Sequence, residues 1–109
     1  MSKLCGSRVA VDVVLDGEGR IAALGQEVKA CALGQASAAL MGAHALGRSR
    51  AELAEAHESL AAYLRGETDR PGNWPGLGVF AHARDFSARH GAILLPFEAA
   101  EAAVGSAAP

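Results

Sequence analysis

The stretch Arg8–Ala30, RVAVDVVLDGEGRIAALGQEVKA, decides the fold. In its first half, apolar side chains occupy every second position up to Leu15, which predicts a strand with one buried face. Residues 16–19, DGEG, predict a turn because glycine readily adopts positive φ. Residues 21–30 are therefore expected to return as an antiparallel partner strand. Within that strand, Gly25 indicates a bulge or a close backbone approach.

Helical patterns follow this hairpin. Residues 34–47 are rich in small helix-forming side chains, and the glycine at the end of this stretch predicts the end of a helix. Ser49-Arg50-Ala51-Glu52 has the form of a capping box and predicts the start of a second helix that stops at Gly66. The apolar residues expected to share one face of that helix are Leu53, Leu60, Ala61 and Leu64.

A loop and a last helix complete the chain. Residues 66–78 contain two prolines, four glycines and the only tryptophan, which predicts an irregular loop. Trp74 is expected to clamp this loop onto the body rather than to stack on a ligand. A helix is predicted over 87–104, with either a kink or a late start caused by Pro96. Residues 105–109 are expected to be disordered.

Length and composition restrict the class of protein. The 109 residues, half of them hydrophobic, are expected to form one globular domain spanning 1–109. The predicted class is α+β: a small antiparallel sheet of two to three strands with helices packed on one face. The open edge of such a sheet favours pairing with a second copy of the chain.

Charge and hydropathy exclude two kinds of partner. The net charge is −2 and the basic residues are scattered, which argues against a nucleic-acid groove. No apolar run approaches the roughly 20 residues that span a bilayer, and the start of the chain has no signal-peptide pattern. We therefore expect no membrane partner and a cytoplasmic location.

Two cysteines and a histidine are the candidate metal ligands. Cys5 precedes the first predicted strand and Cys31 follows the second, so a hairpin brings both to the same edge. Cys31 also lies at the predicted start of a helix, where unpaired N–H groups and the helix dipole favour a thiolate. His90, at the start of the last helix, is the natural third ligand, with His82 as a reserve. Two thiolates need only one or two more donors to hold zinc or an iron–sulfur unit.

Together these motifs resemble the NifU N-terminal, IscU and SufU family of iron–sulfur cluster assembly scaffolds. The resemblance is carried by Cys5-Gly6, the turn at 16–19, Cys31 with the following ALGQAS, and Arg89-His90-Gly91-Ala92-Ile93-Leu94. The 25 residues between Cys5 and Cys31 match the family's spacing, and the long interval that follows is similar to the SufU branch. The resemblance runs from Leu4 to Val104.

Three departures from the family pattern stand out. The aspartate two residues after the first cysteine is Ser7 here, and the third cysteine is replaced by Gly91. The chain begins at the first cysteine, so we expect the family's N-terminal helix and edge strand to be absent. With an aspartate and a cysteine replaced, the resemblance leaves Cys5, Cys31 and His90 as cofactor ligands, and Ser7 as a weak additional metal donor.

The resemblance implies a scaffold or metal carrier that holds a transient iron–sulfur cluster, or a zinc or iron ion. It also implies a cysteine desulfurase and iron–sulfur acceptor proteins as partners, and no enzymatic turnover. A second hypothesis is a degenerate scaffold that serves as a metal-free interaction module in sulfur or iron–sulfur metabolism. A third is a small enzyme with Cys31 as nucleophile and His90 as base, although no orienting acid or oxyanion motif accompanies the pair.

Overall fold

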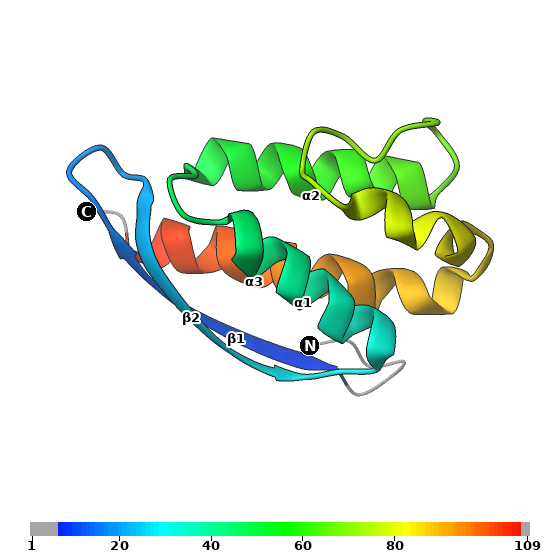
Figure 1. The fold of residues 1–109 in the computed structure, drawn as a ribbon, viewed down its shortest axis with the longest axis horizontal. Helices are drawn as coiled ribbons and strands as arrows, with labels where there is room; N and C mark the ends of the chain where they lie inside the picture. The colour runs from blue at the N-terminus through cyan, green and yellow to red at the C-terminus, as the bar shows by residue number, and fades with distance from the viewer. Residues whose placement is uncertain (1–6, 108–109) are drawn as a thin grey trace.

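The computed structural model describes residues 7–107, which form a two-stranded antiparallel sheet with helices on one face (Figure 1). The predicted α+β class is confirmed. Within this range no helix is both long enough and apolar enough to cross a membrane. In chain order the elements are β1 (Arg8–Leu15), β2 (Ile21–Lys29), α1 (Ala32–His44), α2 (Arg50–Leu64), the 3-10 segments η1 (Leu77–Asp85) and η2 (Ser87–Arg89), and α3 (His90–Ala107).

The hairpin has the predicted alternation but not the predicted bulge. Gly25 pairs regularly with Asp12, so the expectation of an irregularity at Gly25 is wrong. The register shifts instead at the turn end, where Ala22 is the extra residue. The reason lies outside the hairpin: Ile21 exchanges backbone hydrogen bonds of 2.8 and 2.9 Å with Gly47 and Arg48 of the α1–α2 connection. This tertiary contact therefore accounts for the shift in register between the start of β2 and the end of β1.

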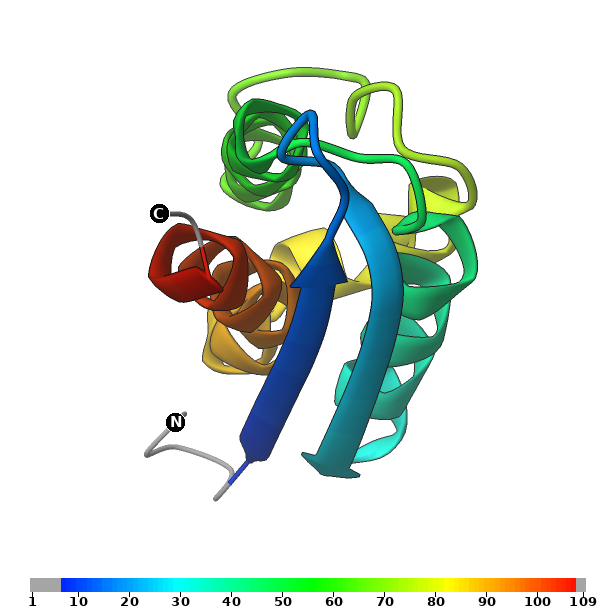
Figure 2. The same cartoon turned by 90° about the vertical axis from the view of Figure 1, so that its left-hand side faces the viewer.

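Helices α1 and α3 cover the inner face of the sheet, α1 behind β2 and α3 along β1, while α2 packs on the far side of α3 (Figure 2). The alternate side chains of β1 point into this layer, as the sequence predicted. The largest fully buried side chains of the core include Ile21, Met41, Leu53, Leu60, Phe80, Ile93 and Phe97.

The loop before η1 is clamped by Trp74, as predicted. This side chain is only 5% exposed, and its indole Nε1 donates a hydrogen bond of 2.9 Å to the carbonyl of Leu40. Its ring meets Phe97 edge-on at 5.2 Å, and the guanidinium of Arg48 lies 4.9 Å from the ring centre. Because the indole N–H has a hydrogen-bond acceptor and the ring packs against Phe97 and Arg48, Trp74 acts as an anchor of the loop.

Helix α3 is longer than predicted at its C-terminal end. The sequence predicted disorder from residue 105, but the helix continues to Ala107, so that expectation is wrong for 105–107. The helix begins at His90 and runs through Pro96, so the expectation that Pro96 delays its start is wrong. Proline has no N–H to donate to the preceding turn. Beside this break, the buried hydroxyl of Ser37 donates to the carbonyl of Ile93 and ties α1 to α3.

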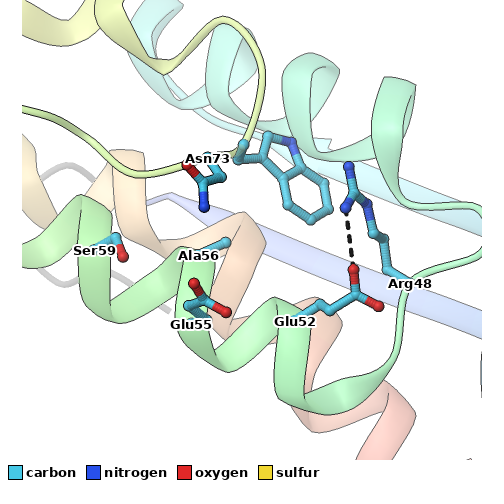
Figure 3. A pocket seen from close by; sticks show the side chains of 7 residues that line it. Arg48, Glu52, Glu55, Ala56, Ser59 and Asn73 are labelled. Carbon is cyan, nitrogen blue, oxygen red and sulfur yellow. Dashed lines mark hydrogen bonds and ion pairs between the residues drawn. The ribbon is translucent and has the colours of Figure 1, made fainter.

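The predicted capping box starts α2. The hydroxyl of Ser49 accepts from the backbone N–H of Glu52, and the Glu52 carboxylate accepts from the backbone N–H of Ser49. The same carboxylate pairs with Arg48 at 3.1 Å, drawn in Figure 3, and with Arg20 at 2.8 Å. The Arg48 guanidinium, then the Ser49 N–H and Arg20, lower the pKa of Glu52 from 4.5 to about 2.

This pKa shift predicts an acid-labile contribution to stability. Because the pKa of Glu52 is lower in the folded chain, its contribution is present above pH 4.5 and is lost as the pH falls towards about 2. Since the carboxylate is about a third exposed, we expect Glu52→Gln to lower the free energy of unfolding by about 1 kcal/mol at neutral pH. Urea unfolding between pH 7 and pH 2 measures this difference, which should shrink over the acidic range. The control is Glu55→Gln, which changes an exposed glutamate of the same helix. An equal loss of unfolding free energy in both variants would contradict the prediction.

Candidate metal-binding site

One end of the molecule brings together the ends of four secondary-structure elements (right-hand side of Figure 1). These are the start of β1, the end of β2, and the starts of α1 and α3. The antiparallel register explains the first two, because Arg8 pairs with Lys29 and the chain entering β1 lies beside the chain leaving β2. Cys31 follows two residues after Lys29. The hairpin therefore delivers Cys31 to the edge that the sequence predicted.

Cys31 occupies the N-cap position of α1 with an extended backbone. Its carbonyl accepts the first helical hydrogen bond, 2.9 Å from the N–H of Gln35, and the Gln35 side chain donates to the carbonyl of Ala30. The Cys31 side chain makes no capping bond, and its thiol is free and exposed. The sulfur is thus accessible to a metal ion or a partner at the N-terminus of α1.

His90 is the first residue of α3 and is half-buried. Its ring Nε2 lies 2.8 Å from the carbonyl of Ala83 in η1. Because a carbonyl can only accept, Nε2 carries the proton in this contact, and the neutral ring keeps its lone pair on Nδ1. A hydrogen bond of this kind, behind a histidine, orients the ring and selects the nitrogen that binds a metal. Nδ1 is the ligand atom that the structure makes available.

Gly34 lies between the segment that leads into α1 and the start of α3. A Cβ atom on this buried residue would lie 2.6 Å from the Cβ of Ala30, 3.4 Å from the carbonyl oxygen of Ala92 and 3.7 Å from its Cβ. The contact with Ala30 is too short, so no side chain fits here without movement of the segment that leads into α1. The helical pattern alone did not predict this role of Gly34; a glycine inside that pattern, shortly after a candidate ligand, was the available signal.

The predicted ligands are only partly placed by the structure. Cys5 lies outside residues 7–107, so the convergence of Cys5 with Cys31 and His90 stays a prediction. Ser7 is buried, with 1% exposure, directly before β1, and His82 is exposed in η1. Over the range that the structure describes, no three Cys, His, Asp or Glu side chains are grouped so that they could hold a metal ion. Cys31 and His90 supply sulfur and imidazole donors, which suit zinc and iron.

The chain is similar to known proteins among the solved structures. No protein-family model and no curated protein sequence matches the chain. One similar solved structure is the N-terminal part of a nitrogen-fixing NifU-like protein from Brucella abortus, with 33% identity and a TM-score of 0.84. The match covers 97% of this chain and 74% of that one.

A second similar structure supports the same fold. It is described as an iron–sulfur cluster assembly scaffold protein for the SUF system of Fervidobacterium islandicum AW-1. Its identity is 24% and its TM-score is 0.80, and the match covers 92% of this chain and 73% of that one. At this level of identity the likeness concerns the fold.

Proposed function

Because this chain belongs to the family of NifU-like N-terminal domains, we propose that it is an iron–sulfur cluster assembly scaffold whose cargo is held by Cys31, His90 and Cys5. The observation that carries the proposal is the free, exposed thiol of Cys31 at the N-terminus of α1, next to the helix that begins with His90. The packing of Gly34 against Ala92 supports this neighbourhood.

Each residue has a distinct role in this proposal. Cys31 and Cys5 supply thiolates, and His90 supplies Nδ1 while its Nε2–H stays on the carbonyl of Ala83. The hydroxyl of Ser7 is a weak additional donor. Gly91, in the position of the family's third cysteine, supplies none. The cargo therefore keeps a coordination position for an outside ligand, which suits transfer better than storage.

The proposed partners follow from this role. A cysteine desulfurase supplies sulfur to the exposed thiol, and iron–sulfur proteins accept the finished cargo. The chain itself holds and hands over the cargo, and we expect no enzymatic turnover from it. A zinc or iron ion bound to the same donors is the simplest form of the cargo that an experiment can detect.

Titration of zinc and ferrous ions into protein purified without affinity metal tests the proposal. We expect Cys31→Ser and His90→Gln to weaken binding at least about tenfold, because each removes one ligand. The matched control is His44→Gln, a change of a histidine at the opposite end of α1 from Cys31. Affinity should also fall as the pH is lowered, since bound thiolates compete with protons.

The state of the histidine ring gives a second readout of the same prediction. Nitrogen NMR should show that Nδ1 of His90 shifts when zinc binds, while Nε2 keeps its proton. A shift at Nε2 instead would disprove the assigned ligand atom. If the wild-type chain and Cys31→Ser bind metal equally poorly at every pH, the scaffold proposal fails. A metal-free interaction module then becomes the better function.

A further inference from the structure

The hydrogen bonding of α3 is interrupted shortly after His90. Pro96 lies inside the helix and has no N–H, so the carbonyl of Ala92 lacks the donor that a regular helix supplies four residues further on. The missing bond is one of those that would join the first turn of α3 to the turn that contains Pro96. The first turn, which begins with His90, is therefore held less firmly by its own helix than the first turn of a regular helix.

Helix α1 contacts this same turn at two points. The hydroxyl of Ser37 donates a hydrogen bond to the carbonyl of Ile93, and Gly34 lies next to Ala92. Residues three apart in a helix lie on one face, so Gly34 and Ser37 both belong to the face of α1 that meets α3. The side chain of Ser37 is completely buried, so water does not compete for its bond to Ile93.

The two helices joined in this way carry two of the proposed ligands. Cys31 is the N-cap residue of α1, and His90 is the first residue of α3. Because Ser37 bonds to the turn that precedes the break, this turn is tied to the helix of Cys31 as well as to the rest of α3. The bond from His90 Nε2 to the carbonyl of Ala83 orients the imidazole ring in addition.

We infer that Ser37 is a positioning residue of the proposed metal site, and that it compensates for the break at Pro96 by fixing the first turn of α3 to α1. The inference rests on the proposed function, because it concerns the spacing of Cys31 and His90 as ligands. Ser37 acts through the backbone of α3 and is not itself a ligand. Its consequence is a site whose two ligands keep their spacing whether or not cargo is bound.

Ser37→Ala, which removes the hydroxyl and little else, tests this role. We expect the affinity for zinc to fall about fivefold, the usual effect of losing one buried hydrogen bond. At saturating cobalt, the visible absorption bands of the bound ion should also shift, since they report the geometry of the ligands. The matched control is Gln26→Met, which removes a hydrogen bond of 2.9 Å from β2 to the Ala38 carbonyl of the same helix. This control should leave zinc affinity and the cobalt spectrum unchanged.

A double-mutant cycle with Pro96→Ala separates positioning from a general effect on stability. Alanine at this position restores an N–H that can bond to the carbonyl of Ala92, so α3 itself then holds its first turn. In that background we expect Ser37→Ala to weaken zinc binding about twofold or less, because the two changes act on one connection. An equal loss with and without Pro96→Ala would overturn the inference, and so would an equal loss in Gln26→Met.

Amide hydrogen exchange in the metal-free chain gives a readout that does not depend on the proposed function. We expect the amides of Leu94 and Leu95 to exchange about fivefold faster in Ser37→Ala and at the wild-type rate in Gln26→Met. Unchanged exchange at these amides in Ser37→Ala would overturn the inference, and so would unchanged zinc affinity in a variant whose exchange is faster. If the wild-type chain binds no zinc, the proposed function fails, and the exchange rates alone then decide whether Ser37 holds this turn.

Discussion

Replacing Phe97 with alanine is expected to lower the free energy of unfolding by about 3–5 kcal/mol. The ring is completely buried, and its centre lies 5.2 Å from the centre of the Trp74 ring in a T-shaped arrangement. Its loss removes apolar burial, leaves a cavity in the core and takes away one face of the contact that anchors the loop before η1. Urea unfolding should show a lower midpoint with an unchanged slope. The fluorescence of Trp74 should shift to the red as the loop loosens.

The control is Phe86→Ala, which changes a phenylalanine that is 56% exposed at the end of η1. We expect this variant to change the free energy of unfolding by less than about 0.5 kcal/mol. A similar cost for both phenylalanines would contradict the assignment of Phe97 to the core. A large cost for Phe97→Ala without a change in Trp74 emission would separate core packing from the clamping of the loop.

Replacing Gly34 with valine is expected to lower the free energy of unfolding by about 3 kcal/mol, although helix propensity alone would favour valine. Valine normally favours a helix over glycine, but here its Cβ would lie 2.6 Å from the Cβ of Ala30 and 3.4 Å from the Ala92 carbonyl. Neither neighbour is a flexible side-chain end, so the segment around Ala30 that leads into α1 must move away from Gly34. Thermal unfolding measures the cost, and zinc titration should show weaker binding because the two helix starts carry Cys31 and His90.

The matched control for this second variant is Gly42→Val, in the same helix. There a Cβ would meet only the side-chain amide of Gln26, at 2.8 Å, which can move away. We expect a change in unfolding free energy of about 1 kcal/mol or less, with unchanged zinc binding. Equal costs at both positions would show that the close approach of Gly34 and Ala92 is unimportant. If Gly34→Val is destabilised but binds zinc normally, the packing around Gly34 is not needed for the proposed metal site.

The sequence by itself determined the local elements. Alternation predicted β1 with its inward face, DGEG predicted the turn, and the capping box at Ser49 predicted the start of α2. These features depend on residues close together in the chain, which is why local patterns are enough to identify them. The position of Cys31 was predictable in the same way, because a cysteine between a strand and a helix lies at the N-terminus of that helix whatever the tertiary structure.

Only the tertiary structure decided the features that join distant segments. The bulge lies at Ala22 because Ile21 bonds to the α1–α2 connection, and α3 continues through Pro96 while Ser37 of α1 supports the carbonyl beside it. The starts of α1 and α3 pack side by side, with Gly34 next to Ala92. In each case the deciding partner lies 26 or more residues away in the sequence, so its contribution to packing and hydrogen bonding cannot be seen in any local pattern.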